Sequence, residues 1–188
     1  MHVILGLGNP GPDYDANRHN VGWWVVDRLA YDWDLGPFER EGRARLARGT
    51  VQDRDVTLVK PTTYMNRSGQ ALRFLADEVE VFDPTRQLMV VVDDAALEVG
   101  RVRFRPFGGA GGHNGLKSVT GALGSEEYAR CRVGVGRMPD GWDLADWVLS
   151  DMPAEDEETV VKLLPELTHA MESWLQDDMD AVMNRFNR

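Results

Sequence analysis

The chain has 188 residues, of which 43% are hydrophobic and 28% charged, a composition that excludes dominant disorder and can supply the core of one domain. Its apolar runs are far shorter than the roughly 20 residues that cross a bilayer, which excludes a membrane span. The net charge of −10 opposes nucleic-acid binding for the chain as a whole, yet 18 of its 21 basic residues are arginines, which suit phosphate.

The N-terminus and the cysteine content indicate the compartment. The opening stretch, MHVILGLGNPG, has no basic segment and no long apolar region, so it predicts a buried strand and not a signal peptide. The single cysteine, Cys131, cannot form an internal disulfide, and no array of cysteine and histidine is spaced for zinc. We therefore expect a cytoplasmic protein without a metal, folded as one domain over residues 1–188.

Strands and helices alternate along the first half of the chain. Residues 2–7 are apolar on both faces, as in a central strand, and are followed by a turn of glycine, asparagine and proline. Residues 21–33 have the apolar spacing of a helix, with Asn17 or Asn20 as its N-cap. Alternating apolar residues predict two strands joined by a tight turn, at 43–51 and 54–61.

The second half alternates in the same way. We expect a helix at 66–81, an apolar strand at 88–94 and a strand with outward arginines at 101–106. A short helix at 116–123 and a last strand at 130–136 follow. The tail over 155–186 is predicted to be helical, with a kink or a break at Pro165. This alternation predicts an α/β fold in which helices flank a largely buried sheet.

A glycine pattern after the first strand resembles the dinucleotide-binding fingerprint. Gly6, Gly8 and Gly11 have the spacing G-x-G-x-x-G, but that motif needs a helix to begin immediately, so that its amides face a pyrophosphate. Here Pro10 and Pro12 remove amide donors, and the next helix is expected only from about residue 20. A nicotinamide cofactor is therefore not expected.

Polar residues that can do chemistry stand at the edges of the predicted elements. Each has an ordinary structural interpretation, since an asparagine often caps a helix, a loop histidine is usually solvated and an aspartate often follows a strand. The set comprises Asn9, His19, Asn66, Asp93, Asp94, His113 and Asn114. A histidine can accept a proton, a carboxylate can hold its tautomer, and amides can donate to an oxyanion. Together these groups indicate hydrolysis of an acyl bond by activated water.

Five motifs give this interpretation a family. They are GLGNPGPDYDANRHNVG, KPTTYMNRSG, VVVDDAALEVG, RVRFRPFGGAGGHNGLKS and RCRVGVGRMP. In order and spacing they resemble the bacterial-type peptidyl-tRNA hydrolase family, and the likeness extends weakly into the tail. The resemblance implies a single α/β domain with a twisted mixed sheet flanked by helices, a monomer without a cofactor. It also implies cleavage of the ester between a peptide and the 3′-terminal ribose of tRNA, which recycles tRNA from peptidyl-tRNAs released by stalled ribosomes.

The resemblance also implies roles for single residues. His19 would activate water and Asp93 would orient His19. Asn9 and Asn66 would hold the substrate near the scissile carbonyl, with Asn66 helping to stabilise the oxyanion, and Asn114 would position water or the peptide backbone. The remaining residues of the expected substrate cleft are Tyr14, Met65 and His113.

The arginines of two strands match the family's clamp for the 5′ phosphate of tRNA. The clamp is expected at Arg105 and Arg132, with Arg103 close by. Side chains alternate along a strand, so Arg101, Arg103 and Arg105 are predicted to share one face. The plain alternative is a solvated strand at the sheet edge. As partner the resemblance implies the acceptor end of peptidyl-tRNA, with its 3′ CCA and 5′ phosphate.

Two points separate this chain from a complete match. Where the family commonly has a second acid after Asp93, at the third position, this chain has Ala96, and Asp94 is expected to point to the opposite face of its strand from Asp93. A different class of function also has to be considered, because organellar splicing factors resemble the family and act as non-catalytic RNA-binding adaptors. The presence of Asn9, His19, Asp93 and Asn114 together favours the hydrolase.

Overall fold

Seven strands form one mixed sheet in the computed structural model, which describes residues 1–78, 82–176 and 178–187. The strands are β1 (His2–Gly6), β2 (Glu39–Glu41), β3 (Ala44–Val51), β4 (Arg54–Pro61), β5 (Leu88–Asp94), β6 (Val102–Arg105) and β7 (Ala129–Gly134). Their order in the sheet is β2-β3-β4-β1-β5-β7-β6. The inner strands β4, β1, β5 and β7 are parallel, while β2, β3 and β6 pair with their neighbours in the antiparallel sense.

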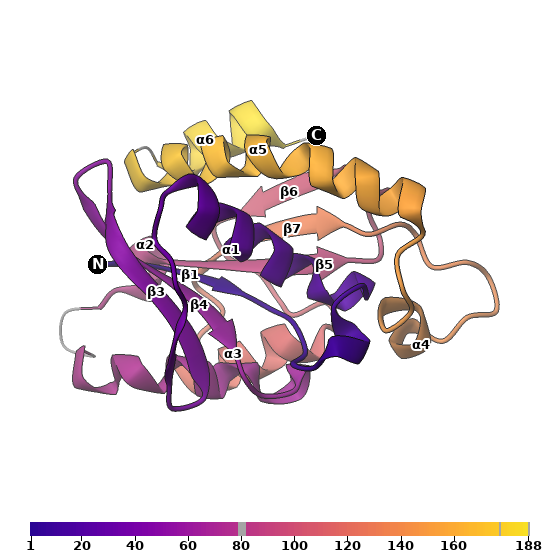
Figure 1. Cartoon of the computed structure of the whole chain (residues 1–188), viewed down its shortest axis with the longest axis horizontal. Helices are drawn as coiled ribbons and strands as arrows, with labels where there is room; N and C mark the ends of the chain where they lie inside the picture. Colours follow the sequence, from indigo (N-terminus) through magenta and orange to yellow (C-terminus); the bar gives the residue numbers. More distant parts are fainter. Residues whose placement is uncertain (79–81, 177, 188) are drawn as a thin grey trace.

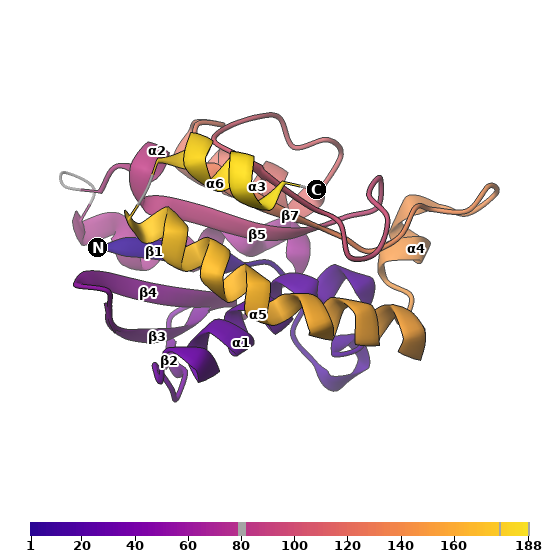
Figure 2. The ribbon, with the colours of Figure 1, turned by 90° about the horizontal axis from the view of Figure 1, so that it is seen from above.

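Helices cover both faces of this sheet (Figures 1 and 2). One face carries α1 (Val21–Asp32), α5 (Ala154–Gln176) and α6 (Met179–Phe186), and the other carries the 3₁₀ segment η3 (Met65–Glu78) and α3 (Asn114–Leu123). Short elements complete the fold: η1 (Pro12–Tyr14), η2 (Arg18–Asn20), α2 (Pro84–Gln87) and α4 (Leu144–Val148). None of the helices in the described ranges is long and apolar enough to cross a membrane.

The central strands are apolar on both faces because both faces are covered. Every residue of β5 is buried, and its side chains alternate between the two hydrophobic clusters on either side of the sheet. This explains the uninterrupted apolar run LMVVV, since a parallel strand between two helical layers has no solvated side. The run ends in two carboxylates at the carboxyl edge of the sheet, where polar groups regain access to a cleft.

A glycine lets α1 pack directly on the sheet. A Cβ atom at Gly22 would lie 2.5 Å from the carbonyl oxygen of Leu7 and 2.6 Å from that of Val91, so only glycine allows this approach. The contact places the start of α1, and with it η2, against the ends of β1 and β5. His19 is thereby held at the same edge of the sheet as Asp93.

The predicted elements are largely confirmed. Strands occupy each of the predicted strand segments, and Gln52 and Asp53 form the tight turn between β3 and β4 with positive φ angles of 48° and 63°. The sequence did not indicate β2, α2 or α4, which are short elements of three to five residues. The helix expected over 66–81 is a 3₁₀ segment that ends at Glu78, and 79–81 lie outside the described residues.

Of the two alternatives predicted at Pro165, a kink or a break, the break is wrong. Helix α5 continues through it to Gln176, and α6 begins at Met179 with Asp178 as N-cap. Proline removes the donor to the carbonyl four residues earlier, which here belongs to Val161, a residue that is 46% exposed. Because Val161 is on the solvent side of the helix, the lost hydrogen bond leaves the buried face packed against the sheet layer.

Candidate active site

The four parallel strands end at one edge of the sheet, and a cleft of about 1030 Å³ opens there. Loops after β1 and β4, the end of β5, the glycine-rich loop before α3 and helix α4 form its walls. The sequence-predicted residues that line it are Asn9, Tyr14, His19, Met65, Asn66, Asp93, His113, Asn114, Arg105 and Arg132. Arg103 is on β6 beside this cleft but does not line it.

The expected contact between His19 and Asp93 is present. Nδ1 of His19 lies 2.8 Å from Oδ1 of Asp93, and both side chains are buried at the floor of the cleft. In the neutral ring, the proton on Nδ1 is donated to the carboxylate. The other ring nitrogen, Nε2, is then unprotonated and able to accept a proton.

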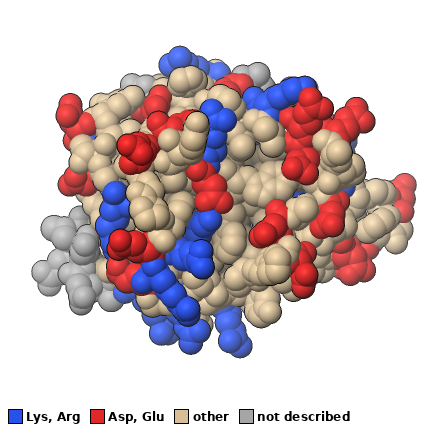
Figure 3. Space-filling model, viewed as in Figure 1, with Lys and Arg blue, Asp and Glu red and all other residues tan. Residues whose placement is uncertain are grey.

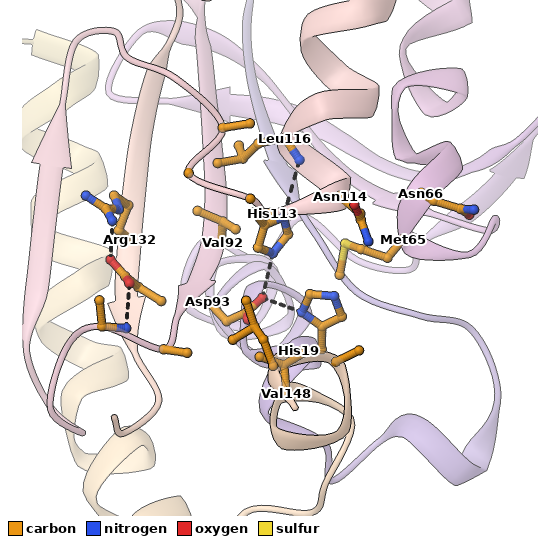
Figure 4. Close-up of a pocket in the computed structure, with 18 of the residues that line it drawn as sticks. His19, Met65, Asn66, Val92, Asp93, His113, Asn114, Leu116, Arg132 and Val148 are labelled. Carbon is orange, nitrogen blue, oxygen red and sulfur yellow. Dashed lines mark hydrogen bonds and ion pairs between the residues drawn. The ribbon is translucent and has the colours of Figure 1, made fainter. Parts of the chain in front are cut away.

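A second histidine shares the same carboxylate oxygen. Nε2 of His113 lies 2.9 Å from Oδ1 of Asp93, and the rings of His19 and His113 have centroids 4.8 Å apart (Figure 4). His113 is also the N-cap residue of α3, where its Nδ1 accepts hydrogen bonds from the backbone N–H groups of Gly115 and Leu116, at 3.1 and 3.3 Å. The sequence placed His113 in the cleft beside Asn114, but it did not predict this link to Asp93.

The two rings keep Asp93 ionised. Burial by itself raises the pKa of this carboxyl, but attraction to His19 and His113 and the hydrogen bonds from both rings outweigh burial. The pKa of Asp93 therefore lies well below its usual range. An ionised Asp93 is what the orientation of His19 requires, since it accepts the Nδ1 proton and stabilises the ring once it becomes positively charged.

The same three side chains have a spacing that a metal ion could bridge, because their ligand atoms lie within 4.8 Å of one another. The hydrogen bonds of His113 argue against that use. Its Nδ1 accepts two backbone N–H groups, so the proton of the neutral ring is on Nε2, the nitrogen that a metal would need. The cluster is therefore better suited to acid–base chemistry than to metal binding.

The side chain of Asn20, which the sequence predicted only as an N-cap, bonds to the backbone of Asn9. Asn20 accepts a hydrogen bond from the backbone N–H of Asn9 at 2.8 Å and donates one to its carbonyl at 3.0 Å. The prediction of Asn20 as one of two candidate N-cap residues of α1 is confirmed, but its side chain makes no capping bond to the helix. The side-chain oxygen of Asn9 accepts from Met65 N–H at 2.8 Å, which leaves its NH₂ group as a donor.

The other two asparagines are exposed at the cleft. Asn114 is the first residue of α3, and its amide points toward the space next to His19, whereas the side chain of Asn66 extends away from it (Figure 4). Met65, which precedes Asn66, is buried beneath the cleft. The amide of Asn114 is thus directed to the site, Asn9 lines the same cleft, and Asn66 is exposed beside it.

Two tyrosines stand at the rim of the cleft. The rings of Tyr14 and Tyr64 meet edge to face, with centroids 6.2 Å apart, and Tyr64 is 60% exposed. The sequence indicated Tyr14 but not Tyr64, which directly precedes Met65. The only hint of Tyr64 in the sequence was its position next to Met65, a predicted site residue.

Four arginines form a block on one face of β6 and β7. Arg103 is paired in register with Arg132, and Arg105 with Arg130, so all four side chains share the face on the α3 side of the sheet. The predicted sharing of one face by Arg103 and Arg105 agrees with this register. Arg105 is exposed, whereas Arg132 forms an ion pair with Asp94, with Nη2 at 2.7 Å from Oδ2.

Arg130 is a site residue that the sequence did not single out. It is only 2% exposed and lines the cleft, with its guanidinium 4.4 Å from the centroid of the Tyr128 ring. Its Nη1 and Nη2 each donate, at 3.0 Å, to the carbonyls of Gly109 and Glu126. Arg130 therefore holds the glycine-rich loop that precedes His113, and it has no free fork for a ligand.

The wall opposite that loop is α4, which the sequence did not predict. Its apolar residues Leu144 and Val148 line the cleft. Arg18, the residue before His19, fastens this wall: its buried guanidinium lies 3.7 Å from the centroid of the Trp147 ring and donates to Ser150 Oγ at 2.6 Å. The histidine loop and α4 are thus held together by one arginine.

Charge is unevenly spread over the surface. Figure 3 shows acidic side chains gathered at the end that carries α4 and the start of α5, and basic ones toward the lower left, over β3 and β4. Three consecutive acids, residues 155–157, stand in the first turn of α5. The net charge of −10 is therefore not spread evenly over this face.

Comparison with known proteins gives a consistent answer over the whole chain. The sequence model of the family described as "Peptidyl-tRNA hydrolase" matches residues 3–188. The chain is 41% identical to the peptidyl-tRNA hydrolase of Lachnoclostridium phytofermentans, an alignment that covers 100% of this chain and 97% of that protein. It is also 41% identical to that of Gemmatimonas aurantiaca, with 100% of both chains covered.

A solved structure matches the fold as well. The peptidyl-tRNA hydrolase of Acinetobacter baumannii superimposes with a TM-score of 0.90 and 28% sequence identity, over 100% of this chain and 94% of that one. The fold is thus shared over the whole of this chain and most of that one.

Proposed function

The chain belongs to the peptidyl-tRNA hydrolase family, and from this premise we propose how its cleft residues divide the work. Its activity is the hydrolysis of peptidyl-tRNA, which makes it a carboxylic ester hydrolase. The bond cleaved joins a peptide, or an N-blocked aminoacyl group, to the 3′-terminal ribose of tRNA. The cell would thereby recover tRNA from peptidyl-tRNAs released by stalled ribosomes. The observation that carries the assignment to this cleft is the buried contact of His19 with Asp93.

His19 is the general base in this proposal. Its Nε2 takes a proton from a water molecule while the water oxygen forms a bond to the acyl carbon. Asp93, bonded to Nδ1, keeps the ring in the required tautomer and stabilises the resulting imidazolium. The tetrahedral intermediate then breaks its bond to the ribose oxygen, which receives the proton. The products are a free peptide carboxyl group and a tRNA with its 3′ hydroxyl restored.

Amide groups orient the ester and stabilise its oxyanion. Asn9 is suited to hold the substrate because Asn20 grips its backbone and Met65 fixes its side-chain oxygen, so its NH₂ group has a set direction. Asn114 positions water or the peptide backbone next to His19. Asn66, exposed at the rim, turns inward to donate to the oxyanion when substrate arrives.

The arginine block receives the tRNA. Arg105 and Arg132 contact the 5′-terminal phosphate, with Arg103 beside them, while the 3′ CCA end enters the cleft toward His19. Support comes from the register of β6 and β7, which places these side chains on one face. Tyr14 lines the path of the 3′ end at the rim. We further propose that the protein acts as a monomer in the cytoplasm, without a cofactor.

Release of a labelled N-acetyl amino acid from N-acetyl-aminoacyl-tRNA tests the activity. We expect the acyl group to appear in solution while the tRNA stays intact. Tight binding of tRNA without release of the acyl group would contradict the proposal and favour the RNA-binding adaptor. The variants His19→Ala and His169→Ala assign the reaction to this cleft, because His169 is an exposed histidine of α5 that does not line the cleft.

A further inference from the structure

Two adjacent carboxylates end β5, and they serve different parts of the cleft. Asp93 bonds to the two histidines, whereas Asp94 pairs with Arg132 of the neighbouring strand. Figure 4 shows this division, with Arg132 and its ion pair on the far side of Val92 from the histidines. The proposed mechanism uses Asp93 and gives Asp94 no role.

The carboxylate of Asp94 has a hydrogen bond at one oxygen and an ion-pair contact at the other. Oδ1 accepts a hydrogen bond from the backbone N–H of Ala96 at 2.9 Å, and Oδ2 lies 2.7 Å from Nη2 of Arg132. The side chain of Asp94 is 6% exposed and that of Arg132 is 39% exposed. One member of the pair is thus anchored in the protein, and the other faces the cleft.

The difference in burial between Asp94 and Arg132 limits how Arg132 can bind an anion. If Arg132 left Asp94, it would abandon a buried carboxylate without its counter-charge, which is strongly unfavourable. A guanidinium has five N–H donors in a rigid fork, so it can keep Asp94 and still offer donors to a second acceptor. Arg132 is therefore held in one orientation, and the pair carries no net charge.

Arg105 differs in both respects. It is exposed, and its hydrogen bond to the carbonyl of Phe104 is long, at 3.4 Å. Within the described residues it is paired with no carboxylate. Arg105 thus keeps its full charge and its freedom to move.

We propose that Asp94 is a positioning residue for tRNA recognition. It holds Arg132 as an oriented hydrogen-bond donor for the 5′-terminal phosphate, while Arg105 supplies the net positive charge. The inference rests on the proposed function, in which both arginines contact that phosphate. In this proposal Arg132 fixes the direction of the hydrogen bonds to the phosphate, and Arg105 provides the electrostatic attraction. The two arginines come from neighbouring strands.

The salt dependence of binding separates the orientation by Arg132 from the charge of Arg105. The slope of log Kd against log salt concentration changes by about one for each uncompensated charge that contacts a phosphate. The probe is deacylated tRNA, with and without its 5′ phosphate, and its Kd is measured over a range of KCl concentrations. Arg105→Gln should make the slope shallower by about one. Asp94→Asn should make it steeper by about one, because Arg132 is no longer neutralised, and should weaken binding severalfold at high salt, where orientation dominates.

The paired variant with both Asp94→Asn and Arg132→Gln is the matched comparison, since it removes the pair without changing net charge. It should weaken binding of 5′-phosphorylated tRNA and leave the salt slope as in the wild type. Asp140→Asn, an exposed acid outside the arginine block, should leave both Kd and slope near the wild-type values. The kcat of Asp94→Asn should stay within about twofold, which a general loss of structure would not allow.

Asp94→Asn is expected to fold, because asparagine can still accept from Ala96 and Arg132 has access to water. If it does not, Arg132→Lys keeps the charge and the partner but loses the fork, and it should raise Kd without altering the slope. The inference is overturned if Arg105→Gln behaves as expected while Asp94→Asn leaves the slope unchanged. If removal of the 5′ phosphate changes no Kd, the proposed clamp fails, and the role of Asp94 fails with it.

Discussion

The histidine cluster and the arginine block lie in one cleft but hold their charges in different ways. Asp93 is buried and accepts from two rings, one of which is itself held by α3. Of the two arginines proposed to contact the phosphate, Arg132 is half-buried and pairs with Asp94, whereas Arg105 is exposed and has no carboxylate partner among the described residues. Buried, fully bonded groups keep the geometry that chemistry needs, whereas exposed cations keep the field that captures a polyanion.

The largest effect should come from the base. His19→Ala removes the group that activates water and should lower kcat about 10²- to 10⁴-fold, with KM little changed. The measurement is peptide release under saturating substrate, with circular dichroism to confirm the fold. His169→Ala, which removes an exposed histidine, should retain the wild-type rate. Nearly normal turnover in His19→Ala would remove His19 from the role of base.

The second largest loss of activity should come from substitution of Asp93. In Asp93→Asn the amide can donate to Nδ1 and impose the wrong tautomer on His19, so kcat should fall roughly 10²-fold or more while KM stays within a small factor. The comparison fails if this variant raises KM and spares kcat, because Asp93 would then belong with the binding groups.

The same variant gives a prediction for stability against pH. The pKa of Asp93 in the folded protein lies below the value of about 3.9 for an unfolded aspartate, so its ionised form stabilises the fold above that pH. The contribution is lost as the pH falls below about 4. The difference in unfolding free energy between wild type and Asp93→Asn should therefore narrow on the acid side, measured by urea titration. A difference that stays constant down to pH 3 would contradict this.

An effect on binding is expected at the exposed end of the cleft. Arg105→Ala removes a charged contact to a part of the substrate remote from the ester, so KM should rise about tenfold while kcat changes little. Steady-state kinetics at fixed ionic strength measures both. An equal fall in kcat would mean that the arginine block takes part in the chemistry, and the contrast between the two regions would be lost.

The smallest effect tests the double use of His113. Loss of an N-cap costs about 1 kcal/mol, so His113→Ala should be less stable than His113→Asn by that amount, because asparagine can cap α3. Both variants lose the donor to Asp93 and should share a similar fall in kcat. Urea unfolding and initial rates separate the two contributions, and equal stability of the two variants would show that the cap is unimportant.

Much of this site could be predicted from the chain. The apolar run before Asp93 indicated a buried strand, and the carboxyl ends of parallel strands meet at one edge of the sheet. Asn9, at the end of the first strand, and His19, before the first helix, were found for the same reason. Motifs in the order of a known family added the partner and the reaction.

Other features were not predictable because they depend on contacts between distant residues. The grip of Asn20 on Asn9 uses the side chain for a contact outside its own helix, although asparagine at a helix start usually caps it. The pairing of Arg132 with Asp94 needs the register of β5 and β7, which no local pattern records. Helix α4 has five residues, too few to show a helical period.

By itself the sequence determined the elements, their apolar faces and which polar side chains stand at strand ends, because these follow from local spacing and from the need to bury apolar groups. Only the tertiary structure decided how those side chains are shared: Asp93 between two histidines, Asp94 with Arg132, and Pro165 inside a continuous helix. The reason is that a hydrogen bond or an ion pair requires the distance between its two atoms to be right to within a few tenths of an ångström. Those distances are set by packing across the sheet, and spacing along the chain does not specify them.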